Sequence, residues 1–322
     1  MQLKSLKVFC DIVGRRSFSR AADENGISQS GASQMVHHLE DYLGVKLIDR
    51  SKRPFVLTPE GEVYYRGCRK LVQRFYSLED DVRSLQEEVS GRVSVASIYS
   101  IGLSHMSRFV QDFIKQHPKA NVQLQYQHPD RVYELIHSEL VDVGLVSYPR
   151  ESRTIQAVAW RREPMVLVCA PEHRLADENP FSLRDLDGEA FVGFDANLRI
   201  RQETDRVFSS HRVSVRLAME FDNIETLKRA IEINAGIGLL PAPTVAKEVA
   251  AGTLVARRPG DIELYRPLAI IHRRGAHFGK TAARFIQLLL SEAGADDELT
   301  AAVGGYGHVP NGQRPGVGST AN

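Results

Sequence analysis

Hydrophobic side chains near the start of the chain recur at three- and four-residue steps, which predicts an amphipathic helix that Gly14 ends. This stripe consists of Leu3, Leu6, Phe9, Cys10 and Val13. Phe18 then opens a short second helix, the pair Asn25-Gly26 supplies a tight turn, and Ser28 is a suitable N-cap for a third helix. The succession of helix, tight turn and helix predicts a helix-turn-helix module.

The third predicted helix has an apolar face and a polar face, each at helical spacing. The apolar face is made by Ala32, Met35, Val36 and Leu39. The polar face is made by Ser30, Ser33, Gln34 and His37. A face that is merely solvated usually carries Lys and Glu, whereas uncharged hydrogen-bonding side chains suit the reading of base edges in a DNA major groove. We therefore predict that this face contacts DNA, and the alternative is a solvated surface.

Residues 44–58 predict a wing, two short strands with basic residues between them. The net charge of the whole chain is only +1, but residues 50–74 contain seven basic side chains and two acidic ones. Positive charge is therefore concentrated in the N-terminal quarter. We expect Arg50, Lys52 and Arg53 to contact DNA phosphates, and we include Arg20 among the DNA-binding residues.

A long helix is predicted next, with Thr58 as its N-cap and Pro59 at its first position. Apolar residues then alternate steps of four and three, which is the seam of a heptad repeat. The seam consists of Tyr64, Cys68, Leu71, Phe75, Leu78, Val82, Leu85 and Val89. We predict that its residues from Leu71 to Leu85 pair two copies of the chain, and the alternative is packing against the chain's own globular part. Ser90-Gly91 is expected to end the helix and to act as a hinge.

The C-terminal two hundred residues alternate predicted strands and helices, which indicates a mostly parallel sheet covered by helices. Strands are expected at 92–96, 122–126, 141–146, 165–169, 190–194, 215–221 and 237–240. Helices are expected at 103–114, 132–138, 224–233 and 281–291. The pattern restarts after Trp160, so we expect two α/β lobes. A chain reversal near 265–271 would return the chain to the first lobe and leave a cleft between the two.

Several of the predicted strands are followed by residues suited to ligand binding. Ligands of open α/β sheets bind beyond the carboxyl ends of the strands, where helix N-termini offer N–H groups. The candidate effector-binding residues are Ser97, Ile98, Tyr99, Ser100, Gln127, His128, Ser147, Tyr148, Asn223 and Ile224. The alternative for each, and also for Arg199 and Arg201, is an ordinary cap or turn. Because amides and hydroxyls converge here, we expect a small anion or carboxylate as the effector.

Four blocks in the N-terminal part resemble the signature of LysR-type transcriptional regulators in order and spacing. They read SFSRAA (17–22), SQSGAS (28–33), LEDYLGVKLIDR (39–50) and LTPEG (57–61). The resemblance implies a winged helix-turn-helix in which Arg50 and Arg53 hold the DNA backbone. It also implies that the groove is faced by Gln29, Ser30, Ser33, Gln34 and His37. Gly31 and Gln34 depart from the common pattern, which leaves open the DNA sequence that is read.

Two weaker motifs, VDVGLV (141–146) and AGIGLLP (235–241), resemble the family's effector domain, which is like a periplasmic binding protein. The resemblance also implies that residues 97–100 and 127–128 meet the effector. The predicted fold class is an α+β multidomain chain, with residues 296–322 as a disordered tail. Its domains are a winged helix-turn-helix at 1–58, a linker and dimerisation helix at 59–90, and a two-lobed α/β effector domain at 91–295 (lobe I about 91–162 plus 267–295, lobe II about 163–266).

Composition excludes several other classes. No run approaches the roughly 18 apolar residues of a membrane helix, and the N-terminus is charged, so we expect a cytoplasmic protein with no membrane partner. An exported solute-binding protein is disfavoured for the same reason. Cys10, Cys68 and Cys169 lie far apart, so we expect no disulfide, metal site or cofactor, and Cys169 has no sulfur partner for a thiol switch. The sequence contains no Gly-x-Ser-x-Gly nucleophile motif, no Gly-x-x-x-x-Gly-Lys phosphate loop, no Gly-x-Gly-x-x-Gly dinucleotide motif and no His-Glu-x-x-His zinc motif. These absences argue against an enzyme.

The expected partners are double-stranded promoter DNA, a small-molecule effector and further copies of the chain. The heptad seam predicts a homodimer, and the resemblance implies a homotetramer. An activator would also contact RNA polymerase. We expect effector binding in the cleft to bias closure of the lobes and thereby the spacing of the DNA-binding domains. The sequence does not identify the effector, the target promoter or the direction of regulation.

Overall fold

The computed structural model describes residues 2–83, 89–177, 181–276 and 278–291. Its described part divides into two compact units. Unit 1 comprises Met1–Trp160 and Pro267–Ser291, and unit 2 comprises Arg161–Arg266. Within these described ranges, no helix is both long enough and apolar enough to cross a bilayer.

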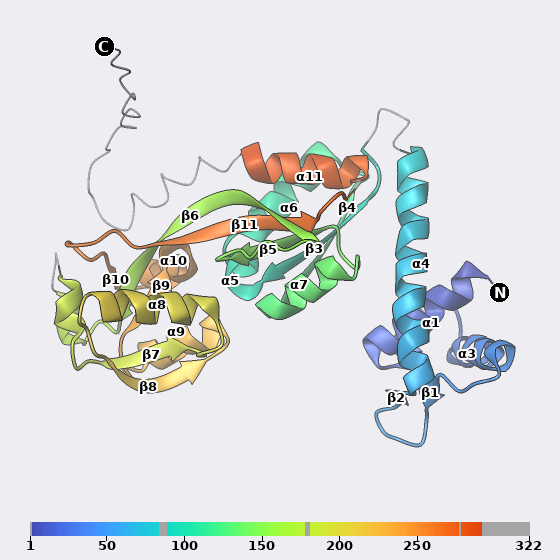
Figure 1. The fold of residues 1–322 in the computed structure, drawn as a ribbon, viewed down its shortest axis with the longest axis horizontal. Helices are drawn as coiled ribbons and strands as arrows, with labels where there is room; N and C mark the ends of the chain where they lie inside the picture. Colours follow the sequence, from blue (N-terminus) through green and yellow to red (C-terminus); the bar gives the residue numbers. More distant parts are fainter. Residues whose placement is uncertain (1, 84–88, 178–180, 277, 292–322) are drawn as a thin grey trace, which may run out of the picture. The chain divides into compact units, whose positions relative to one another are not determined.

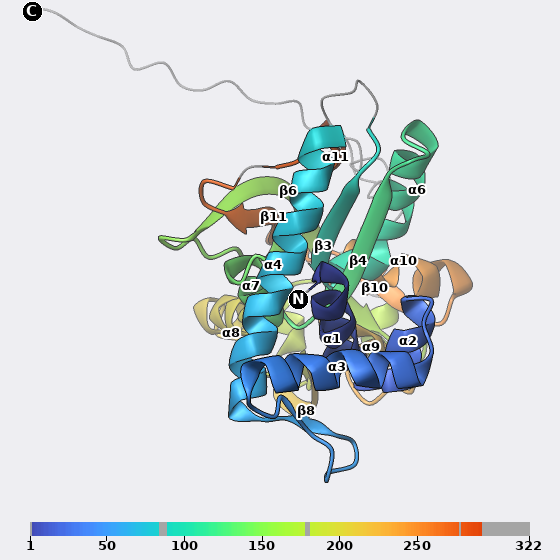
Figure 2. The same cartoon turned by 90° about the vertical axis from the view of Figure 1, so that its right-hand side faces the viewer.

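Unit 1 begins with three helices, a two-stranded wing and a long helix (Figures 1 and 2). These elements are α1 (Leu3–Arg15), α2 (Phe18–Glu24), α3 (Gln29–Leu43), β1 (Ile48–Asp49), β2 (Val56–Leu57) and α4 (Pro59–Arg83). The hydroxyl of Ser28 accepts the N–H of Gly31, and the hydroxyl of Thr58 accepts the N–H of Gly61. Both predicted N-caps are therefore confirmed.

Two backbone details shape this module. The predicted helix end at Gly14 is wrong, because α1 continues to Arg15 and closes with Arg16 in the left-handed conformation at φ 49°. Gly61 lies in the first turn of α4, where an added Cβ would be 2.0 Å from the carbonyl oxygen of Leu47. Only glycine allows α4 to start this close to the wing.

A hydrophobic core joins α1, α2 and α3 to the first part of α4. Phe9 and Val36 are fully buried in it, and Cys68 of α4 is 2% exposed. Tyr64 packs against the same core, so the first two residues of the predicted seam belong to the chain's own module. The exposed seam of α4 consists of Leu71 (59%), Phe75 (40%), Leu78 (53%) and Val82 (61%). Leu85 lies outside the described residues.

The rest of unit 1 is a sheet with helices on both faces. Its parallel strands are β3 (Arg92–Ile98), β4 (Asn121–Gln127) and β5 (Val143–Ser147), with β3 in the middle. Its helices are α5 (Tyr99–Ile101), α6 (Ser107–Gln116), α7 (Pro129–His137) and α11 (Lys280–Ser291), and a π-helical turn (Gly102–Met106) joins α5 to α6. Helices α6 and α11 lie on one face and α7 on the other (Figure 1). Phe113 and Phe285 pack edge to face between α6 and α11, with ring centroids 5.1 Å apart.

Four further strands pair in the same sheet, and two of them lie wholly within the Arg161–Arg266 stretch of unit 2. They are β6 (Ile155–Cys169), β9 (Gly238–Pro241), β10 (Val255–Arg257) and β11 (Tyr265–Arg273). The strand order is β10-β6-β11-β5-β3-β4, with β9 also paired to β6. Because β9 and β10 are antiparallel to β6, and β11 is antiparallel to β5, the sheet is mixed rather than mostly parallel. The strand predicted from Met165 begins at Ile155, since buried charges at Arg161 and Glu163 mask its apolar pattern.

Unit 2 also contains a parallel pair of strands and three helices. These are β7 (Ala190–Phe194), β8 (Arg216–Phe221), α8 (Arg199–Ser210), α9 (Ile224–Glu232) and α10 (Ala242–Ala251), with short 3-10 helices at Arg174–Ala176 and Leu183–Leu186. The sequence pattern does not predict α8 or α10. Helix α8 buries only Ile200, Thr204 and Phe208, about one side chain per turn, which is too narrow a stripe to stand out.

Candidate nucleic-acid interface and effector loops

The polar face of α3 is available to a partner. The opposite face is anchored by Ala32, Val36 and Leu39, which are buried in the module core. Four of the predicted reading residues are exposed and Ser33 is half-buried: Gln29, Ser30, Ser33, Gln34 and His37. Figure 2 shows α3 near the start of α4, with the β1–β2 loop projecting beyond both. The module therefore presents a helix face and a loop together.

Arg50, at the end of the first wing strand, is held against α3. Its Nη1 donates to the hydroxyl of Ser33 at 3.1 Å, and its guanidinium carbon lies 5.1 Å from the centre of the Phe18 ring. The Phe18 ring packs in turn on Phe55 of the wing, at 5.3 Å between centroids. Arg50 is thus held beside the polar face of α3, and it is still exposed at the surface. Sequence reasoning missed the contact with Ser33, because nothing in the spacing links the two positions.

The other predicted basic contacts are less constrained. Lys52 and Arg53 are exposed in the wing loop, and Arg20 is exposed on α2. Beside them, the N–H and the hydroxyl of Ser51 both donate to the carboxylate of Asp49, which lowers the pKa of Asp49. These hydrogen bonds hold the backbone at the point where the wing loop leaves β1.

Glu40 is a buried residue of α3 whose contacts with the wing the sequence analysis missed. Its side chain is 3% exposed, and Oε1 accepts the N–H groups of Leu47 (2.9 Å) and Ile48 (3.2 Å). Its other oxygen faces Lys46 at 3.2 Å. A buried carboxylate needs such donors. Glu40 therefore connects α3 to the wing. The signal in the sequence is an acidic residue at a position of α3 that helical spacing assigns to its apolar face.

The candidate effector residues of unit 1 gather at one edge of the sheet. Ser97 and Ile98 are the last residues of β3 rather than a loop, and both are buried; the Ser97 hydroxyl donates to the Ile98 carbonyl at 3.0 Å. Ser97 pairs with Tyr126 of β4 and Leu145 of β5, so the carboxyl ends of the three strands are neighbours. Tyr99 is 40% exposed at this edge. Ser100, beside it, is 8% exposed.

The other candidates of unit 1 continue the same edge. Gln127 ends β4, and His128 precedes α7, its imidazole 3.8 Å from the carboxylate of Asp130. Ser147 ends β5. Tyr148 follows it with φ 47°, and its N–H donates to the carbonyl of Pro267 at 2.9 Å. The backbone at Tyr148 is held in a conformation that non-glycine residues seldom adopt.

In unit 2, Asn223 caps α9, and its side-chain oxygen accepts the N–H of Glu225 at 2.8 Å. Ile224 is 2% exposed, so it belongs to the core of this unit. Arg199 is exposed, whereas Arg201 bonds to the carbonyl of Phe194 and to two carboxylates, which favours a structural role for Arg201.

Two family models match the chain. One is described as "Bacterial regulatory helix-turn-helix protein, lysR family" and matches residues 3–62; the other is described as "LysR substrate binding domain" and matches residues 86–294. The chain belongs to the LysR family of transcriptional regulators. A RuBisCO operon transcriptional regulator of Allochromatium vinosum is 27% identical to this regulator. The match covers 91% of the present chain and 97% of the relative. The HTH-type regulator CysL of Bacillus subtilis is 23% identical over 89% and 96%. These relatives are regulators, not enzymes.

Solved structures share the regulator's fold. Full-length CbnR in complex with its target DNA matches with a TM-score of 0.68 at 20% identity, covering 91% of this chain and 100% of that one. The regulatory domain of Synechocystis CcmR in complex with 2-PG matches with a TM-score of 0.58 at 22% identity, covering 63% and 97%. These structures share its fold, and the two family models give the regulator a LysR DNA-binding module and a substrate-binding, or effector-binding, domain.

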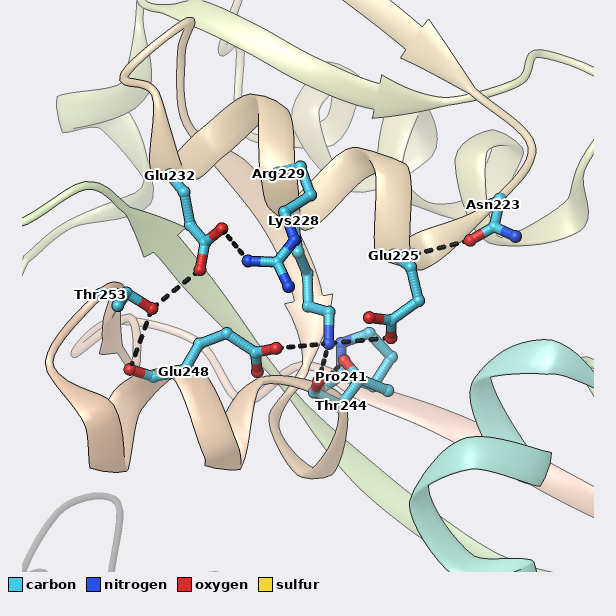
Figure 3. A network of polar contacts seen from close by, with 9 residues as sticks. All are labelled: Asn223, Glu225, Lys228, Arg229, Glu232, Pro241, Thr244, Glu248 and Thr253. Atoms are coloured by element: carbon cyan, nitrogen blue, oxygen red, sulfur yellow. Dashed lines mark hydrogen bonds and ion pairs between the residues drawn. The ribbon is translucent and has the colours of Figure 1, made fainter.

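A buried lysine, Lys228, stabilises unit 2 of the regulator on the helix that Asn223 caps (Figure 3). The Lys228 ammonium lies 2.8 Å from the carboxylates of both Glu225 and Glu248 and donates to the carbonyl of Thr244 at 3.1 Å. Its side chain is only 6% exposed. Lys228 therefore joins α9 to α10 and holds Glu225 in the first turn of α9. The sequence analysis missed it, because a Lys on an amphipathic helix normally indicates a solvated face.

Two features of the regulator lie apart from the predicted effector edge. A groove of about 810 Å³ in unit 1 is lined partly by Phe113, Lys280 and Arg284, and none of the candidate effector residues borders it.

Cys169 is fully buried in β6, and burial raises its pKa to about 11. Such a thiol is a poor nucleophile, which supports the argument against a thiol switch.

Proposed function

We propose that the regulator reads promoter DNA with the polar face of α3 in the major groove, while Arg50, Lys52 and Arg53 contact the backbone. The observation that carries this proposal is the contact of Arg50 with Ser33, which joins the wing to the reading face. Footprinting of the full-length protein on its own upstream region tests it. Protection of two half-sites about one helical turn apart, or a multiple of that, is expected. No protection under any condition would contradict the proposal.

Replacing Lys52 and Arg53 together with alanine is expected to weaken binding to all DNA sequences alike. Each lost phosphate contact lowers the slope of log K against log salt by about one, so the slope per module should fall by about two. A salt titration of DNA binding measures this. Lys247→Ala removes an exposed cation of α10 and should leave the slope unchanged. If the double variant has the same salt dependence as the wild type, the wing does not contact the DNA backbone.

We further propose that the exposed seam of α4 pairs two chains. Leu78→Glu is expected to raise the dimer dissociation constant about a hundredfold, because the interface would have to bury a carboxylate. Analytical ultracentrifugation measures the change. Val63→Glu is the matched control, since Val63 is also an exposed apolar residue of α4 (65%) but lies outside the seam. If both variants stay dimeric, the seam is not the contact. Assembly of dimers into tetramers is part of the same proposal.

The effector proposed for the regulator is a small anion or carboxylate bound by the strand-end residues of unit 1, and Asn223 stays a candidate contact within unit 2. Exposed Tyr99 and the backbone N–H groups that begin α7 support it. A relative's regulatory domain was solved with 2-PG. Calorimetry of the full-length protein against phosphate, short carboxylates and neutral metabolites is the test. Binding of the neutral compounds alone would overturn the anion assignment.

Effector binding is proposed to bias lobe closure and thereby to change the spacing of the DNA-binding modules on the promoter. The regulator is proposed to act in the cytoplasm. If the regulator is an activator, contact with RNA polymerase follows from the same proposal.

A further inference from the structure

His37 is the last residue of the reading face, and it has a specific neighbour. Its ring Nδ1 lies 2.7 Å from the carboxylate of Asp41, one turn further along α3. An ionised carboxylate can only accept hydrogen bonds, so Nδ1 carries a proton and donates a hydrogen bond to Asp41. In a neutral imidazole the other nitrogen, Nε2, is then an acceptor.

The neighbouring hydroxyls of the reading face are held in other ways. Ser33 accepts from Arg50, and Ser30 bonds to Ser28 at 2.9 Å. The side chains of His37 and Asp41 are each 57% exposed, so the pair lies at the surface that meets a partner. The hydrogen bond from Nδ1 to Asp41 fixes which ring atom is left for that partner.

We propose that Asp41 is a positioning residue for base recognition. By accepting a hydrogen bond from Nδ1–H, it leaves Nε2 of His37 as a hydrogen-bond acceptor for the DNA. In the major groove the bases that offer an amino donor are adenine, through N6, and cytosine, through N4. His37 therefore selects adenine or cytosine at one position of each half-site. This inference rests on the proposed use of the polar face of α3.

An ordinary surface ion pair makes a different prediction. A pair of residues four apart on an exposed helix stabilises the helix only slightly, by about 0.3–0.5 kcal/mol, and has no effect on base choice. Removing a carboxylate near DNA would then strengthen binding to all sequences alike, because less negative charge faces the phosphates. Base preference, measured position by position, separates the two roles.

The experiment is selection from a randomised duplex library by the full-length protein at about pH 8. The wild-type protein is expected to prefer adenine or cytosine about fivefold at one position of each half-site, the value of a single hydrogen bond. Asp41→Ala should reduce this preference to about twofold or less and leave the other positions unchanged. His37→Ala should lose the same preference.

Two further variants complete the design. Asp41→Asn keeps an oxygen acceptor for Nδ1 and should retain most of the preference. Asp23→Ala removes an exposed acid of α2 from the same module and should leave base choice unchanged.

Three results would contradict the inference or its basis. If Asp41→Ala strengthens binding to all sequences alike without altering base choice, Asp41 is only part of a surface ion pair. If His37→Ala selects the same sequences as the wild type, His37 does not read a base. If alanine at Gln29, Ser33 and Gln34 also leaves the selected sequences unchanged, the proposed use of α3 itself fails.

Discussion

Glu163→Ala is expected to lower the free energy of unfolding of the effector-binding half by about 3–5 kcal/mol. Glu163 on β6 and Arg266 on β11 form a buried ion pair, with side chains 3% and 1% exposed. The Arg266 Nε donates to the Glu163 carboxylate at 2.9 Å, and Nη2 donates to the same oxygen. Removing the carboxylate leaves a guanidinium charge in the interior, and the loss of its partner carries most of the cost.

Urea unfolding of the full-length protein, followed by tryptophan fluorescence, measures this change. Trp160 is the single tryptophan of the chain, is buried in the effector-binding half, and donates its indole N–H to the Leu289 carbonyl at 2.7 Å. A double variant with methionine at both positions of the pair should recover most of the loss, since neither charge then remains in the interior. Glu203→Ala breaks an exposed pair on α8 and should cost under about 1 kcal/mol. Equal losses in the single and double variants would contradict this account.

Glu40→Ala is expected to destabilise the DNA-binding module by about 2–4 kcal/mol. The N–H groups of Leu47 and Ile48 would lose their acceptor at buried positions, and each such group costs about 1–3 kcal/mol. The wing would separate from α3, so DNA affinity should fall together with stability. Amide hydrogen exchange at Leu47 and Ile48 is the direct measurement.

The controls for Glu40 separate hydrogen bonding from charge. Glu40→Gln keeps one oxygen acceptor and should retain most of the protection of the two amides. Asp23→Ala removes an exposed acid and should leave exchange unchanged. Unchanged exchange in Glu40→Ala would mean that the wing is held by the hydrophobic core alone.

Local chemistry explains which elements were predictable. Ser28 and Thr58 begin helices because a hydroxyl can accept an N–H of the first turn, and this signal is contained in a few neighbouring residues. The polar face of α3 was predictable for the same reason, since helical spacing alone defines it. The heptad pattern also predicted the exposed seam from Leu71 to Val82, whereas Val89, its last predicted member, is buried at 8% exposed. It could not show that Cys68 is used by the module core, because that depends on how α4 packs against α1.

The features that escaped prediction depend on contacts between distant residues. Arg50 and Ser33 are 17 positions apart, and Lys228 and Glu248 are 20 apart. The β6 strand includes Arg161 and Glu163, and Glu163 is compatible with burial because Arg266 lies opposite it. Charged residues therefore appear in the sequence as surface positions until the partner is known. The candidate effector residues illustrate the same limit, since Ser97 and Ile98 continue β3 instead of forming a loop.

Among the residues that the structure describes, unit 2 falls within one stretch of chain, Arg161–Arg266, which is bounded on both sides by unit 1. Two recombination points in a gene are therefore enough to exchange this whole unit between relatives. Such an exchange would replace Asn223 and the Lys228 cluster while leaving α3, the wing and α4 untouched. The two boundaries, after Trp160 and before Pro267, mark where a chimeric regulator could be joined with the strand-end residues of unit 1 kept intact.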